Sequence, residues 1–121
     1  MRRFCMAAGL VLAFLAPTAA GAGEADVVDV KIEKSGGTYR FHVTVRHADA
    51  GWDHYADRWD VLAPDGQVLG SRVLLHPHVA EQPFTRSLGG VVIPPELESV
   101  RIRAHDKLHG HGGREFVVRL P

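Results

Sequence analysis

Histidine is the residue type in this chain that is best suited to chemistry. The sequence contains eight histidines, and two pairs are spaced two residues apart, in His76-Pro77-His78 and His109-Gly110-His111. In an extended segment this spacing directs both rings to the same side. Imidazole together with carboxylate suits zinc, copper(II) or nickel. The spacing therefore predicts a transition-metal site.

Seven residues are the expected ligands, or partners that orient the ligands. They are His76, His78, His109, His111, His54, His105 and Asp106. Zinc or copper is the expected cofactor, and carriage, buffering or sensing of the metal is the expected role. Binding should weaken below about pH 6, because protonated imidazole is not a ligand. The alternative is that these are surface histidines with local hydrogen bonds, and that the glycines serve turn geometry alone.

A second stretch, residues 51–59, is dense in aromatic and charged side chains. Its interpretation as a recognition surface uses Trp52, Asp53 and Tyr55, with Arg86 from a later segment. The protein would then be a metal-independent module that contacts a protein or glycan of the cell envelope. In the alternative interpretation Trp52 covers the end of the fold, while Trp59 is expected in the core in either case.

Catalysis and nucleic-acid binding are not expected. The sequence has no Gly-x-Ser-x-Gly, no His-Glu-x-x-His and no phosphate-cradling loop. Without Arg2 and Arg3, the 14 basic residues fall to 12 against 14 acidic residues, a net charge of −2. A binder of nucleic acid needs a basic face instead.

The N-terminal residues have the pattern of a signal peptide. A basic start, an apolar run and a small-residue exit at Ala20-Gly21-Ala22 predict a signal peptide over residues 1–22 and one domain over residues 23–121. The apolar run is too short to span a bilayer, so no membrane span is expected in the mature chain. Cys5, the only cysteine, would leave with the signal. The domain would be periplasmic or secreted.

The domain itself is predicted to be all-β, because apolar residues recur with a period of two. In residues 39–45, for example, Tyr, Phe, Val and Val alternate with polar residues. Turn signals bound each segment, and Gly89-Gly90 predicts a bulge. Seven strands are expected, within residues 28–33, 39–46, 59–63, 68–74, 85–93, 100–104 and 116–120.

Successive antiparallel strands place their connections at alternate ends of a sandwich. The loops 47–56, 75–84 and 105–113 should therefore share one end, here called the histidine end. Seven of the eight histidines fall in these loops, and the turns at 35–37, 64–66 and 94–95 hold none.

Two features support a resemblance to a known superfamily. They are Trp59 on the third strand, and the sixth strand, residues 100–106, before a glycine-rich loop. The chain resembles the immunoglobulin and fibronectin type III superfamily, including small secreted bacterial proteins of that architecture. The resemblance implies a seven-stranded antiparallel β-sandwich, and it implies architecture only.

Overall fold

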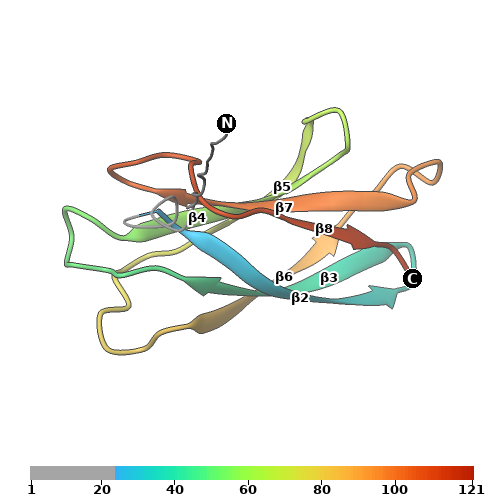
Figure 1. The fold of residues 1–121 in the computed structure, drawn as a ribbon. Helices are drawn as coiled ribbons and strands as arrows, with labels where there is room; N and C mark the ends of the chain where they lie inside the picture. Colours follow the sequence, from blue (N-terminus) through green and yellow to red (C-terminus); the bar gives the residue numbers. More distant parts are fainter. Residues whose placement is uncertain (1–23) are drawn as a thin grey trace, which may run out of the picture.

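The computed structural model describes residues 24–121. The predicted signal peptide, residues 1–22, and Cys5 lie outside the described residues. The described chain forms seven strands (Figure 1). They are β2 (Asp26–Ser35), β3 (Thr38–Arg46), β4 (Ala56–Leu62), β5 (Val68–Val73), β6 (Phe84–Val91), β7 (Ser99–Asp106) and β8 (Phe116–Arg119).

The strands form two antiparallel sheets. One sheet has the order β2-β3-β6, and the other has the order β5-β4-β7-β8. The sheets lie face to face in Figure 1, as in a β-sandwich. The prediction of an all-β domain with seven antiparallel strands is confirmed.

Alternating side chains from both sheets fill the space between them. Phe41, Val43 and Val45 of β3 are fully buried, and Ile102 of β7 approaches from the other sheet. Trp59 of β4 is also fully buried, as expected for the third strand. Because one face of each sheet is apolar, packing the two faces together is the main source of stability.

Register irregularities occur in several strand pairs, and two of them bear on the sequence predictions. Between Leu88 and Val91, Gly89 and Gly90 lie opposite a single residue of β3, which confirms the predicted bulge. In β2 the prediction was wrong at Val28, since a bulge between Val27 and Asp29 makes Val27 the buried residue. A bulge adds one residue to the strand and so reverses which side chains face inward.

The three histidine-bearing loops lie at one end of the sandwich, at the left of Figure 1. They connect β3 to β4, β5 to β6, and β7 to β8. Within residues 24–121, no helix has the length and apolar character needed to cross a membrane.

Candidate metal centre

His47 and Asp49 continue the alternation of β3 beyond its last residue. Val45, His47 and Asp49 are buried, whereas Arg46 and Ala48 between them are exposed. The pattern that brings valines into the core thus also brings an imidazole and a carboxylate inside. Both side chains are fully excluded from solvent.

Asp106 is buried for the same reason. In β7 every second residue faces inward, and Asp106 follows Ala104 as the last of this series. Its Oδ1 accepts hydrogen bonds from the backbone N–H of Leu108 (2.6 Å) and of His109 (3.0 Å). Burial alone would raise the pKa of Asp106, but these bonds and contacts with the side chains of His109 and His47 outweigh it. The pKa is held well below its ordinary value, so this carboxylate stays ionised.

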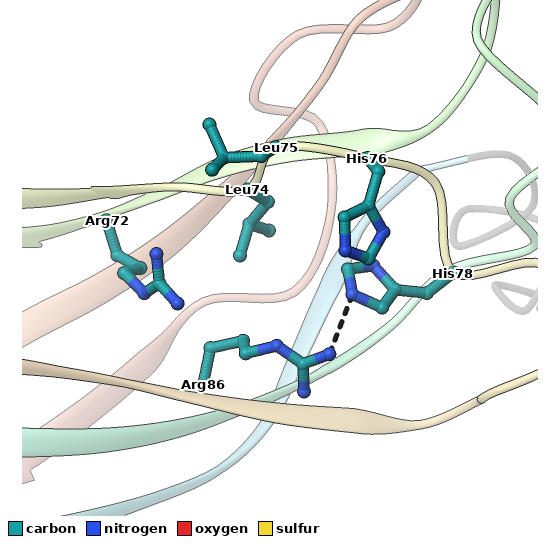
Figure 2. Close-up of a pocket in the computed structure, with 6 residues that line it drawn as sticks. All are labelled: Arg72, Leu74, Leu75, His76, His78 and Arg86. Atoms are coloured by element: carbon teal, nitrogen blue, oxygen red, sulfur yellow. Dashed lines mark hydrogen bonds between the residues drawn. The ribbon is translucent and has the colours of Figure 1, made fainter.

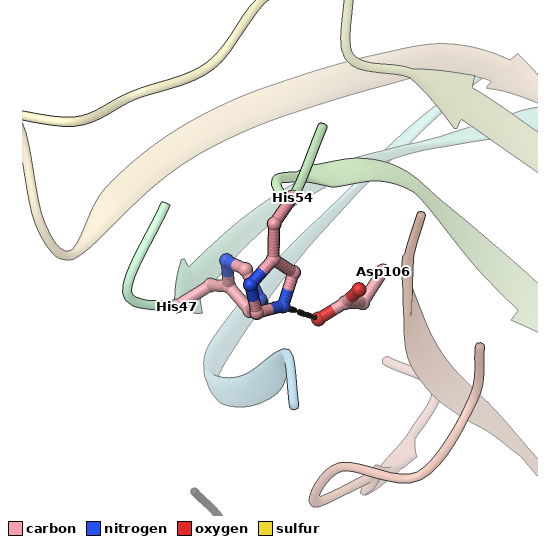
Figure 3. Close-up of side chains that lie close together, drawn as sticks. All are labelled: His47, His54 and Asp106. Carbon is pink, nitrogen blue, oxygen red and sulfur yellow. Dashed lines mark hydrogen bonds and ion pairs between the residues drawn. The ribbon is translucent and has the colours of Figure 1, made fainter. Parts of the chain in front are cut away.

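Three imidazole rings converge on the other oxygen of Asp106. Oδ2 lies 2.5 Å from Nε2 of His47, 2.8 Å from Nε2 of His54 and 3.3 Å from Nδ1 of His109. Figure 3 shows the rings of His47 and His54 beside this carboxylate. The ligand atoms of His47, His54 and Asp106 all lie within 4.8 Å of one another. His47, His54 and Asp106 therefore form a close ligand group, and His109 joins it through its contact with the same oxygen.

A tight turn brings His109 into this group. Asp106 and Gly110 exchange two backbone hydrogen bonds of 2.9 and 3.0 Å. Gly110 has φ +73°, in the left-handed region that favours glycine. The ring of His109 then lies edge to face against His54, with 4.9 Å between their centres.

Asp49 holds the opposite side of His47. Its Oδ1 contacts Nδ1 of His47 and accepts a hydrogen bond from the backbone N–H of Ala56 (3.2 Å). Its Oδ2 accepts the backbone N–H of His78 at 2.6 Å. One buried carboxylate therefore connects the β3–β4 loop to the β5–β6 loop and fixes the ring of His47.

The observed separations come close to those that a metal ion requires. Ligands about 2.0–2.1 Å from a tetrahedral zinc ion lie about 3.3 Å apart. Oδ2 of Asp106 is 2.5–3.3 Å from the three nitrogens. A zinc ion would require the two shorter contacts with Oδ2 to widen by several tenths of an ångström, and the side chains of His54 and His109 are only partly buried.

The structure separates the seven residues that the sequence singled out. They fall into three groups: His54, His109 and Asp106 with His47; His105 and His111; and His76 and His78. His109 and His111 lie in the loop after β7, where the alternation of an extended segment does not apply. Within β7, His105 and Asp106 are neighbours and therefore face opposite ways. His105 is directed away from Asp106, its neighbour in the chain.

His105 and His111 lie beside arginines on the four-stranded sheet. His105 Nδ1 is 2.6 Å from Asp57 Oδ1, and Nε2 of His111 accepts a hydrogen bond from Arg58 (2.9 Å). Burial, then the charge of Arg103 and the neighbouring His105, lower the pKa of His111. Because its Nε2 lone pair is already used and cations lie nearby, His111 is a poor ligand for a metal ion.

His76 and His78 form the third group. Their rings are 4.7 Å apart, and His78 stacks on Phe84 with 3.9 Å between ring centres. Nε2 of His78 accepts a hydrogen bond from Arg86 at 2.9 Å. This nitrogen too is occupied by a guanidinium.

His47 is the residue that the sequence reasoning missed. It was placed in a loop at the histidine end but was not among the seven expected ligands and partners. The signal that identifies it is parity, because it continues the inward series of β3. The same parity rule selects Asp106 and excludes His105.

The residues proposed for a recognition surface differ in exposure. Trp52 is 63% exposed and packs edge to face on Tyr55, which is itself buried. Asp53 is exposed in the same loop. Arg86 lies on β6, where it contacts His78 and Glu81.

Sequence comparison identifies a relative of most of this chain. A protein of Halomicrobium mukohataei named "Putative lipoprotein" is 46% identical to it over 96 residues. The aligned part is 78% of this chain and 47% of the relative, so the chain spans about half the relative's length. No protein-family profile matches the chain. No solved structure matches it either.

Proposed function

We propose that this protein is an exported binding module that holds zinc or copper(II) for carriage, buffering or sensing. The ligands are Nε2 of His47, Nε2 of His54, Nδ1 of His109 and Oδ2 of Asp106. The observation that carries the proposal is the position of His47 between two buried carboxylates, with two more imidazoles on the same oxygen.

This arrangement calls for a cation. A neutral imidazole carries a single N–H, so His47 can donate to Asp49 or to Asp106 but not to both. An additional proton or a metal ion between His47 and Asp106 removes the conflict. A metal ion would also use the nitrogens of His54 and His109, which approach the same oxygen of Asp106.

Asp49 supplies the usual support of a metal-bound histidine. Such a histidine commonly donates its other N–H to a carboxylate, which fixes the tautomer and the ring orientation. Asp49 accepts this N–H from His47 while backbone N–H groups of Ala56 and His78 hold the carboxylate in place. His47 is thereby directed with Nε2 toward the other ligands.

The site also has a route to solvent. The side chains of His47 and Asp106 are fully buried, whereas those of His54 and His109 are 22% and 37% exposed. An ion can reach the latter two first and then displace the direct contacts within the cluster. This combination suits reversible loading.

Two further features support an envelope-associated binding role. The strand orders β2-β3-β6 and β5-β4-β7-β8 agree with the immunoglobulin and fibronectin type III type of sandwich, an architecture that commonly carries binding loops. The name of the relative supports placement at the cell envelope, and a signal peptide over residues 1–22 would deliver the chain there. We infer binding rather than catalysis as the role of the domain.

Calorimetric titration tests the metal site. The purified protein, without a histidine tag and treated with chelator, is titrated with Zn²⁺ and Cu²⁺ at pH 7.5. The test variants are H54Q, H109Q and D106N, and H42Q is the matched control. His42 lies on β3 and contacts Ser87 and Glu33, outside the three loops.

We expect binding of one ion per chain by the wild type and by H42Q. Removal of a residue that supports a ligand lowers metal affinity by about 10–100-fold. Each test variant removes a ligand and should therefore lower the affinity by more than this. Binding that H54Q, H109Q and D106N all retain would refute the assignment, as would the absence of binding by the wild type. Circular dichroism of each variant verifies that the fold is intact.

A metal-independent interaction surface is the second candidate. The observation in its favour is the exposure of Trp52, a large aromatic that packs only partly on Tyr55. Tryptophan offers rigid contact area at binding surfaces, whereas Tyr55 is buried beneath it and supports the ring. Pull-down of envelope proteins and glycans with wild type and W52A tests this role, and equal recovery by the two proteins would reject it.

A further inference from the structure

A small cavity lies between the edge strands of the two sheets, apart from the proposed metal ligands. Its volume is about 80 Å³, and Arg72, Leu74, Leu75, His76, His78 and Arg86 line it (Figure 2). Arg72 belongs to β5 and Arg86 to β6, so each sheet contributes one arginine. Figure 2 shows His76 and His78 beside the guanidinium group of Arg86, and Arg72 at the opposite side of the cavity.

The polar groups around this cavity are incompletely paired. Nε of Arg72 is buried and has no hydrogen-bond partner among the described residues. Nδ1 of His78 is in the same state, on a side chain that is 3% exposed. Buried donors without a partner are rare in folded proteins and call for a ligand or water.

The local charge favours an anion. Arg72 and Arg86 are permanent cations. Burial, then the charge of Arg86 and the neighbouring His76, lower the pKa of His78, so that ring is neutral at pH 7. An anion in the cavity would be attracted by both charges.

The acids near the cavity do not fill this role. Glu81 contacts Arg86 at 3.3 Å, but its side chain is 60% exposed, and exposed ion pairs contribute little. Asp49 Oδ2 is engaged by the backbone N–H of His78 and lies 4.0 Å from Nδ1 of that residue. Within the described residues, the side chain of Arg72 makes one hydrogen bond, from Nη1 to the backbone oxygen of Val73 (3.0 Å).

We propose that this cavity binds a small oxyanion between Arg72 and Arg86. Guanidinium groups recognise phosphate, sulfate and carboxylate through paired N–H donors. The volume exceeds the roughly 30 Å³ of one water molecule and lies well below the roughly 300–1,000 Å³ of pockets for drug-sized ligands. The ligand is therefore a single oxyanion group, and the site does not depend on the proposed metal centre.

Nuclear magnetic resonance titration tests this site on metal-free protein. Sodium phosphate, sodium sulfate and sodium acetate are added separately, with chloride keeping the ionic strength constant. The signals followed are the arginine Nε–H groups and the backbone amides of residues 72–76, 78 and 84–88. The variants are R72Q and R86Q, with R119Q as control, since Arg119 lies exposed on β8 at the other edge of the four-stranded sheet.

We expect saturable shifts at Arg72 and Arg86 with a dissociation constant of roughly millimolar or below. R119Q should bind as the wild type does, and R72Q and R86Q should weaken binding at least tenfold. Saturation by phosphate or sulfate alone would assign a tetrahedral anion, and saturation by acetate would assign a carboxylate. Shifts that no anion saturates, or that persist in both R72Q and R86Q, would overturn the proposal. If R86Q does not fold, the comparison of R72Q with the wild type and R119Q is sufficient to test the proposal.

Discussion

Asp49 connects two of the three loops at the histidine end through a single buried carboxylate. One oxygen contacts the ring of His47, and the other accepts the backbone N–H of His78. If this residue sets the direction of His47, its effect on metal affinity should be measurable without any change in the ligands.

We therefore expect D49N to weaken metal binding by about 10–100-fold. Asparagine keeps the shape of the side chain but replaces one acceptor oxygen by an N–H₂ group, so one of the two loop contacts is lost. Calorimetry on D49N is compared with D57N, which removes a carboxylate from His105 instead. Equal affinity of D49N and wild type would show that Asp49 does not position the ligand.

The pH dependence of stability should reflect His78. Burial, Arg86 and His76 lower its pKa in the folded protein, against opposing effects of Asp49 and Glu81. The unfolded chain therefore takes up this proton at higher pH than the folded one, and stability falls as the pH drops below about 6.5. In chelator, wild type should lose more stability than H78Q between pH 7.5 and 5.5. Parallel urea-denaturation curves for the two proteins would contradict this.

At the scale of the elements, the turn after β7 carries His109 to the cluster, and its geometry depends on Gly110. A side chain at φ +73° is strained by roughly 1 kcal/mol. Gly110→Ala should therefore destabilise the protein and also weaken metal binding, because the turn that holds His109 is altered.

Gly36→Ala is the matched control for this substitution. Gly36 has φ +61° in the β2–β3 turn at the other end of the sandwich, and an added Cβ would meet nothing within 4 Å at either position. We expect G36A and G110A to lose similar stability in urea denaturation. Only G110A should also lose metal affinity. Equal metal affinities in the two variants would mean that the turn does not position His109.

The strands were predictable because period-two alternation is clear in segments such as β3 and β7, and because glycine or proline signals mark several of the turns. The common end of the three loops followed from strand order. The grouping of the histidines did not, because it depends on the exact residue at which each strand stops alternating. His105 and Asp106 show the difficulty, since one peptide unit separates a side chain on the outer face from one in the interior.

Bulges are a second obstacle to prediction from sequence. The bulge in β2 reverses the faces of Val27 and Val28, and no glycine or proline marks it. At Gly89-Gly90 the glycines do mark the bulge, and a Cβ on Gly89 would lie only 2.7 Å from Nη2 of Arg40. The first feature depends on packing across the sheets, and the second is visible in the residues themselves.

For the whole molecule, the proposed ligands join the two sheets. His47 follows β3 of the three-stranded sheet, and Asp106 ends β7 of the four-stranded sheet. An ion bound by both is lost on unfolding, so at 100 times its dissociation constant it should stabilise the fold by about 2.7 kcal/mol.

For a domain of this size, that energy corresponds to a rise in Tm of roughly 10–20 °C. Differential scanning calorimetry with and without Zn²⁺ measures the rise in Tm. D106N is the control, and Zn²⁺ should not raise its Tm. A Tm that Zn²⁺ leaves unchanged in the wild type would argue against binding to the folded protein.

The start of β2 also lies at the histidine end. Arg114, in the β7–β8 loop, donates its backbone N–H to Asp26 and accepts that of Val27, whereas the C-terminus lies at the opposite end (Figure 1). An affinity tag or surface linker fused ahead of Glu24 would crowd the loops, and a polyhistidine tag there would add competing imidazoles. Attachment through Pro121 instead orients the loops outward, so immobilised protein should be coupled by its C-terminus.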